Sequence, residues 1–175
     1  MLIEEDRLAA AIEALARARR LSTVMRIVRL VARDVSGADG VTFVLRDGDC
    51  CYYADENAIQ PLWKGKRYPL GSCISGWVMR NRQAVAIPDI YADPRIPHAV
   101  YRTTFVKSMA MVPVRDMDPV AAIGAYWAEH HEPTDQELRV LQVLADSSAL
   151  ALARVHGWCG TGKPTHSDPE GSIQL

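Results

Sequence analysis

Residues 68–113 read YPLGSCISGWVMRNRQAVAIPDIYADPRIPHAVYRTTFVKSMAMVP, and this stretch decides the fold. Five prolines divide it into short pieces, because proline interrupts both helices and inner strands. The pieces between the prolines are rich in apolar and aromatic residues, so the stretch must cover another part of the molecule. It predicts a strand, an irregular cover and a second strand that together enclose a ligand pocket. The alternative is a long structural crossover that is packed solid.

Three segments outside this stretch have the apolar spacing of helices. The first covers residues 4–20, and the second covers residues 22–36 with Ser22 as its expected N-cap. The third begins at a capping box, Thr134-Asp135-Gln136-Glu137, and extends to residue 156. The second helix also carries three arginines that we expect to face solvent, namely Arg26, Arg29 and Arg33.

Strands are predicted on both sides of the crossover. Residues 41–46 alternate in polarity, and residues 50–55 return after an Asp-Gly turn. Further strands are expected at 83–87, 107–114 and 120–128, the last of which is continuously apolar and therefore central. The order predicts an α+β fold with an antiparallel sheet of five to six strands. Its N- and C-terminal helices would cover one face, and the irregular, partly helical crossover would cover the other.

Four motifs in this order resemble those of GAF domains. The segment GSCISGWV at 71–78 resembles the family's G-x-G-I-x-G-W-V, and AIPDIYADPR at 86–95 resembles its I-P-D-V-x-x-D-P-R. The strand SMAMVPV at 108–114 and the segment IGAYW at 123–127 resemble the family's two central strands. The resemblance covers about residues 22–155. It implies the GAF/PAS-like architecture described above.

The resemblance also implies a regulatory module that senses a small molecule or another signal, as in two-component systems, but it names no ligand. We divide the chain into an N-terminal helix at 1–21 that contacts a second copy, a GAF domain at 22–156 and a flexible tail at 157–175. The expected partners are an unknown small molecule and a histidine kinase or other output domain. No kinase, cyclase or DNA-binding segment is visible after residue 155, so we expect either a stand-alone protein or the input end of a longer one.

Composition excludes several other classes. The chain has 175 residues, a net charge of −1 and 49% hydrophobic residues, which is typical of a globular domain. The balanced charge argues against a nucleic-acid surface, and no run of about 18 apolar residues is present to span a membrane. The acidic start MLIEEDRLAA does not resemble a signal peptide. We therefore predict a cytoplasmic protein with reduced cysteines that binds neither nucleic acid nor membranes.

We expect any ligand to lie between the crossover and the central strands. Aromatic residues would supply apolar walls, while a carboxylate and hydroxyl groups would orient the polar groups of the ligand. The predicted lining residues are Trp77, Ile87, Asp89, Tyr101, Phe105, Ser108 and Tyr126.

Cys73 lies in the crossover, and we predict a small buried side chain rather than a nucleophile. No Lys or His lies within a few residues of it to lower its pKa. GAF-type reductases of free methionine sulfoxide carry a cysteine where this chain has Ser75, and residues 98–111 lack the expected resolving cysteines. The Cys-His pair of bilin-binding members and the N-K-x-F motif of cyclic-nucleotide-binding members are also absent. The sequence therefore predicts neither an enzyme nor covalent attachment of a bilin.

Two further patterns carry no predicted site. Residues 157–163 have the spacing of a phosphate loop, but a helix precedes them and Pro164 follows the lysine. The adjacent His130 and His131 have no Cys or His at ligand spacing nearby, so we predict no metal site.

The helices at the two ends of the fold predict a homodimer. The first helix has a narrow apolar stripe with no cover assigned to it within the chain: Leu8, Ile12, Leu15 and Ala16. The last helix has a coiled-coil-like seam that includes Leu141 and Leu152, in addition to the apolar face that covers the sheet. We therefore expect both helices to pack on a second copy, so that glutamate at Leu141 and Leu152 would leave a folded monomer.

Three hypotheses from different classes follow from the sequence. The first is a ligand-sensing regulatory module whose end helices carry the signal. The second is a thiol-based redox enzyme or sensor that uses Cys73, similar to the free methionine sulfoxide reductases. The third is a ligand-free dimerisation scaffold with a solid core.

Overall fold

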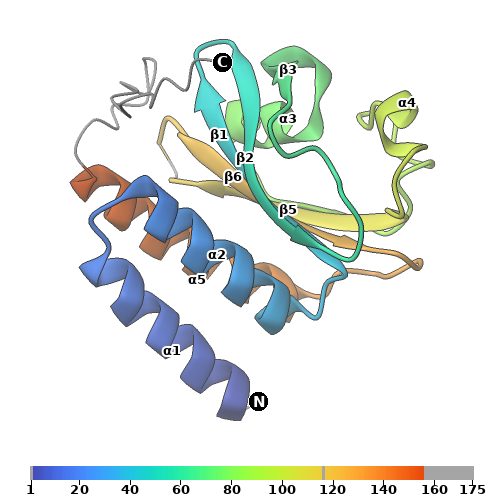
Figure 1. The fold of residues 1–175 in the computed structure, drawn as a ribbon. Coiled ribbons are helices and arrows are strands. Elements are labelled where there is room, and N and C mark those ends of the chain that lie inside the picture. Colours follow the sequence, from blue (N-terminus) through green and yellow to red (C-terminus); the bar gives the residue numbers. More distant parts are fainter. Residues whose placement is uncertain (1, 116, 156–175) are drawn as a thin grey trace, which may run out of the picture.

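The computed structural model describes residues 2–115 and 117–155 (Figure 1). The predicted flexible tail at 157–175 lies outside these residues. The structure has five α-helices, one short 3-10 helix and six strands among the described residues. In chain order they are α1 Leu2–Arg17, α2 Leu21–Ser36, β1 Gly40–Asp47, β2 Cys50–Ala58, β3 Arg67–Pro69, η1 Leu70–Ser72, α3 Ile74–Asn81, β4 Val85–Ile87, α4 His98–Tyr101, β5 Ser108–Val114, β6 Ala121–Trp127 and α5 Asp135–Arg154.

The six strands form one antiparallel sheet in the order β3-β2-β1-β6-β5-β4. The central pair joins β1 to β6, with Thr42 opposite Gly124. Because every residue of β5 and β6 is buried, these strands are covered on both faces, as the apolar run at 120–128 predicted. The Asp-Gly turn between β1 and β2 is also confirmed, with Gly48 at a φ of 59°.

Helices α2 and α5 cover one face of the sheet, and α1 packs against both of them on the side away from the sheet (Figure 1). Val24, Val28 and Ala32 of α2 and Leu141, Leu144 and Ala145 of α5 join the core on this face. The crossover elements α3 and α4 lie on the opposite face, as expected. None of the helices within residues 2–115 and 117–155 combines the length and apolar character needed to cross a membrane.

The expectation that α1 has no cover within the chain is wrong. Ala11, Leu15 and Ala18 of α1 and of the turn after it are buried against α2 and α5, whereas Ile12 is exposed. The Arg154 side chain also donates a hydrogen bond to the Leu15 carbonyl oxygen at 3.3 Å. Leu8 and Leu15 of the predicted stripe do face this core, but Ala11 and Ala18 complete the stripe in place of Ile12 and Ala16. Alanines are weak hydrophobic signals, so the sequence pattern did not single out these two positions.

The predicted second interface of α5 is occupied by the same chain. Leu141 is 0% exposed and Leu152 is 1% exposed, and both belong to the core between the helices and the sheet. The large apolar residues that α5 leaves exposed are instead Val143 and Leu150. The sequence showed two apolar faces correctly, but α1 and α2 cover the face that was assigned to a second copy.

Two local predictions about α2 also fail. Its N-cap is Arg20 without a side-chain cap, rather than Ser22. Of the three arginines expected to face solvent, Arg26 is exposed, but Arg29 and Arg33 are only half-exposed. Arg29 forms an ion pair with Asp55 at 3.0 Å, and Arg33 donates to Asn57 at 2.9 Å. Both arginines therefore attach α2 to β2, which is possible because long cationic side chains can extend along a packed surface.

Candidate functional site

The crossover face of the sheet carries a cluster of four aromatic rings. Trp63, in the loop after β2, lies at its centre, with ring centroids 4.7 Å from Tyr101, 5.5 Å from Tyr126 and 5.5 Å from Tyr53. The rings meet edge to face, which is a favourable arrangement of aromatic quadrupoles. Since Tyr53 comes from β2, Tyr126 from β6 and Tyr101 from α4, the cluster joins the sheet to its cover.

The position of Trp63 is set by a single carboxylate. Glu56, on β2, accepts backbone N–H hydrogen bonds from Leu62 at 3.0 Å, Trp63 at 2.9 Å and Lys64 at 2.8 Å. Charge-assisted hydrogen bonds of this kind are stronger than those between neutral groups. The loop is therefore pinned to β2 at the residue that carries the central ring.

Hydroxyl groups are enclosed within this aromatic surface. The Thr42 and Tyr126 hydroxyls are hydrogen bonded at 2.9 Å, and the Tyr53 hydroxyl lies 3.2 Å from that of Ser75. Burial raises the pKa of Tyr53, Tyr101 and Tyr126, so all three phenols remain protonated and can donate. The site thus combines apolar walls with a few fixed polar groups.

Gly124 provides the space that the Tyr126 hydroxyl occupies. A Cβ at this position would overlap the Tyr126 hydroxyl and the Met111 methyl group. A glycine usually weakens a central strand. Here the close approach of the Tyr126 hydroxyl to the backbone explains why a glycine occupies the position. Gly124 therefore belongs to the site although it contributes no side chain.

Two thiols lie beside the hydroxyl groups. Cys51 on β2 is 0% exposed, and Cys73, the N-cap residue of α3, is 7% exposed. The Cys73 Sγ lies 3.3 Å from the Ser75 Oγ, and the Cys51 thiol adjoins it. The Cys51 thiol, the Ser75 hydroxyl and the first N–H groups of α3 lower the pKa of Cys73 to about 6, although burial opposes them.

The reason given for an inert Cys73 is therefore wrong. No cationic neighbour is needed, because a second thiol, a hydroxyl group and the N-terminus of α3 lower the pKa of Cys73 instead. The neighbouring Cys73 thiol and burial raise the pKa of Cys51, so the proton stays on that thiol. Whether Cys73 acts as a nucleophile remains a prediction to be tested.

The structure brings together only some of the predicted lining residues. Tyr101 and Tyr126 contact Trp63, and Ile87 is buried on the same face. Phe105 and Trp77 pack against the edge of this core and are half-buried. The binding role of all seven residues stays a prediction.

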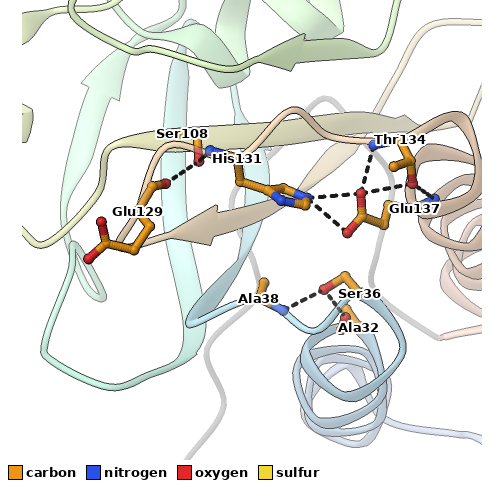
Figure 2. Close-up of polar contacts among 8 residues, drawn as sticks. All are labelled: Ala32, Ser36, Ala38, Ser108, Glu129, His131, Thr134 and Glu137. Atoms are coloured by element: carbon orange, nitrogen blue, oxygen red, sulfur yellow. Dashed lines mark hydrogen bonds and ion pairs between the residues drawn. The ribbon is translucent and has the colours of Figure 1, made fainter.

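Ser108 lies on the opposite face of the sheet (Figure 2). Its hydroxyl donates to the Glu129 carbonyl oxygen at 2.8 Å and accepts the His131 backbone N–H at 3.2 Å. His131 in turn contacts the Glu137 carboxylate at 2.9 Å, at the N-terminus of α5. These two hydrogen bonds fix the connection from β6 to α5. Ser108 lies on this face because side chains alternate along β5, so that Ser108 shares the face of Ala110 rather than that of Met109.

Trp77 and Asp89 lie towards the rim of the crossover. The Arg95 guanidinium covers the Trp77 ring at 4.5 Å, and its bond to Asp93 lowers the pKa of that carboxyl group. Asp89 caps the turn that follows β4 by accepting the Tyr91 backbone N–H. A shallow surface hollow of about 330 Å³ adjoins this turn and is lined by Ala86, Ile87, Pro88, Asp89, Ala92, Asp93 and Pro94.

Sequence reasoning missed several residues of the aromatic and polar cluster. Strand alternation could have identified Thr42 and Tyr53, because each shares a face with the core residues of its strand. The apolar character of Trp63 predicts that it packs on the body of the domain, but no local pattern signals its aromatic partners or the pairing of Cys51 with Cys73, since these contacts join segments that are distant in sequence.

Comparison with known proteins agrees with this architecture. A family model described as "GAF domain" matches residues 18–153, so the chain belongs to the GAF family. A search of curated proteins found no significant match.

Solved structures with similar folds include two GAF domains and a reductase. The GAF domain of an Acinetobacter phosphoenolpyruvate-protein phosphotransferase has a TM-score of 0.75 at 14% identity, covering 88% of this chain and 95% of that one. The free methionine-R-sulfoxide reductase of Neisseria meningitidis has a TM-score of 0.74 at 19% identity, with 86% and 89% covered. The GAF-B domain of DevS from Mycobacterium smegmatis has a TM-score of 0.61 at 20% identity, with 74% and 90% covered. At these identities the likeness shows the fold alone.

Proposed function

We propose that this protein is a regulatory module that senses a small molecule bound beneath the crossover. The observation that carries the proposal is the group of hydroxyls from Thr42, Tyr53, Ser75 and Tyr126, enclosed by aromatic rings. A surface that served only for packing would gain more from apolar groups at these positions. A ligand site, in contrast, needs apolar walls with a few well-placed polar groups.

A ligand would enter by displacing parts of the crossover rather than the sheet. β3 and β4 have three residues each and α4 has four, so each element buries little surface of its own. Short elements with few contacts open at low free-energy cost. The aromatic cluster would then exchange ring contacts for contacts with the ligand.

The bound state would reach the helices through β6. Tyr126 of this strand faces the crossover, while Ala125 and Trp127 face the helix layer. A movement of Tyr126 would therefore be passed to α2 and α5, and from there to a histidine kinase or another output domain. Such coupling requires that the ligand favours one of two arrangements of these elements.

We further propose that the protein acts as a homodimer. Val143 and Leu150 are 41% and 65% exposed on the outer face of α5, and Leu30 of α2 is 49% exposed. Apolar residues on this layer would be covered by the same layer of a second copy. The interface thus uses the outer face of α5, rather than the seam through Leu141 and Leu152.

Native mass spectrometry of the protein purified from cells tests the function directly. We expect a bound small molecule whose occupancy falls when Tyr126→Phe removes the enclosed hydroxyl group. The matched control is Tyr91→Phe, because Tyr91 is 47% exposed outside the cluster, and it should leave occupancy unchanged. A protein without any bound mass that forms a stable dimer would support the scaffold instead. Turnover of free methionine sulfoxide would support the reductase.

A further inference from the structure

The topology of the crossover brings two cysteines from separate elements together. β2 pairs with β3 so that Cys51 lies opposite Tyr68, and the chain then turns through η1 to place Cys73 before α3. The Cys73 Sγ lies 3.5 Å from the Pro69 carbonyl oxygen, within the same turn. Both thiols belong to the same core beneath the crossover, and each thiol is the largest influence on the pKa of the other.

The surroundings of the two sulfur atoms differ in a way that assigns them different roles. Ser75 can donate its hydroxyl to the Cys73 Sγ while it accepts from the Tyr53 phenol, so a hydrogen-bond relay supports the Cys73 thiolate. Cys73 is also the more exposed of the two and adjoins the surface at Gly71 and Ser72. Cys51 is fully buried and holds its proton against the Cys73 sulfur.

We propose that Cys51 and Cys73 form a reversible disulfide when a hydroperoxide oxidises the protein. The Cys73 thiolate attacks the peroxide, the O–O bond breaks, and a sulfenic acid forms with release of hydroxide or alkoxide. The Cys51 thiol then loses its proton and attacks the Cys73 sulfur, which expels water and closes the disulfide. Overall the two thiols lose two electrons and two protons, and the peroxide is reduced to water or to water and an alcohol.

Cys50 supplies a control next to the pair. It precedes Cys51 on β2 and is half-buried, and successive residues of a strand point to opposite faces of the sheet. Cys50 should therefore not reach Cys73, although its direct neighbour Cys51 does. This site does not depend on the proposed small molecule, since it requires only the two thiols and an oxidant.

The disulfide would connect β2 directly to the N-terminus of α3. In the reduced protein this junction is held by the Cys73 contacts and by the close packing of Gly76 on Leu70. A covalent bond would fix the crossover to the sheet at this point and remove the thiolate from the N-terminus of α3. Oxidation would thereby restrict the opening of the crossover.

Tryptic mapping after treatment with hydrogen peroxide tests the proposal. Trypsin separates the peptide 47–64, which carries Cys50 and Cys51, from the peptide 68–80, which carries Cys73. Under non-reducing conditions we expect these two peptides to be joined in the wild type and in Cys50→Ser, and to separate after reduction with dithiothreitol. All proteins would carry Cys159→Ser, so that the fourth cysteine does not enter the count.

The single variants distinguish the two roles. Cys51→Ser should accumulate a sulfenic acid at Cys73 that a dimedone probe traps, whereas Cys73→Ser should lose free thiols to peroxide roughly tenfold more slowly. A linkage through Cys50, or wild-type peptides that stay separate after peroxide, would overturn the proposal. The wild-type map needs no variant to fold, and its failure would leave the small-molecule proposal untouched.

Discussion

Gly76 marks the closest approach between α3 and the chain before it. A Cβ at this position would overlap the Leu70 carbonyl oxygen, which is backbone and cannot rotate away. We expect Gly76→Ala to destabilise the protein by about 1–3 kcal/mol, because α3 would have to move off η1. Urea unfolding followed by circular dichroism measures this change.

Gly71→Ala is the matched control for this prediction. The Cβ it adds would meet only the Arg80 side chain, at 3.6 Å, which is an ordinary van der Waals contact. Its free energy of unfolding should stay within about 0.5 kcal/mol of the wild type. Equal losses in the two variants would mean that the approach to Leu70 is not the cause.

The capping box of α5 makes stability depend on pH. Glu137 accepts the Thr134 backbone N–H at 2.6 Å and contacts His131 at 2.9 Å (Figure 2). Partial burial raises the pKa of Glu137, but the hydrogen bonds from Thr134 and His131 lower it by more. The net pKa therefore lies below its ordinary value of 4.5. A carboxyl group whose pKa is lower when folded stabilises the protein above the unfolded value, and this contribution is lost as pH falls through the folded pKa.

We therefore expect Glu137→Gln to lower stability at pH 7 by about 0.5–2 kcal/mol, which is typical for the loss of a cap. The variant should also lose less of its remaining stability than the wild type between neutral pH and pH values below 4.5. Thermal unfolding across this range, with the exposed Glu132→Gln as control, would decide the point. Parallel acid curves for Glu137→Gln and the wild type would contradict it.

Residue-scale chemistry was the part least visible in the sequence. The capping box was predicted because all of its members lie within four residues. The low pKa of Cys73 was missed because Cys51 lies on β2, distant in sequence, and the orientation of the N–H groups of α3 cannot be recognised from the sequence. Burial and partners of a titratable group are properties of the tertiary structure, so local spacing cannot supply them.

At the scale of elements, α5 offers the sharpest test, because its two apolar faces have different roles. Leu141 and Leu152 are buried in the core, so glutamate at both should abolish cooperative folding rather than produce a folded monomer. Each change removes a buried leucine and places a carboxyl group without a partner in the core, and the two losses together are comparable to the roughly 5–15 kcal/mol that a domain has available. Far-UV circular dichroism and thermal melts would show the loss.

Glutamate at Val143 and Leu150 should instead leave the fold intact, because both side chains are exposed. If the protein dimerises through this face, sedimentation at micromolar concentration should show a dimer for the wild type and a folded monomer for this variant. A wild type that sediments as a monomer would remove the proposed interface. Glutamate at the exposed Ile59, in the loop after β2, serves as the control for an added surface charge.

The element order, the hairpin and the division of helices from crossover followed from periodicity and turn residues. Periodicity did not reveal which partner covers a helix, so α1 was assigned to a second copy although it packs within the chain. It also did not reveal the side of the sheet to which Ser108 points, because every residue of β5 is buried and the pattern has no polar alternation there.

At the scale of the whole molecule, the central position of β1 has a consequence for folding during synthesis. Its strand partners are β2, which follows directly, and β6, whose Gly124 pairs with Thr42. Pairings between such distant segments form slowly, because the entropy of closing a long loop is lost before the strand contacts contribute any stabilising free energy.

On the ribosome, α2 and the β1–β2 hairpin therefore emerge well before the strand and the helix that complete their core. Until β6 and α5 have been made, the apolar face of α2 lacks the part of its core that these two segments supply. The nascent chain must hold this surface exposed, and exposed apolar surface of this kind binds chaperones or aggregates. A domain whose core is completed by β6 and α5 thus cannot bury this surface until both segments have left the ribosome.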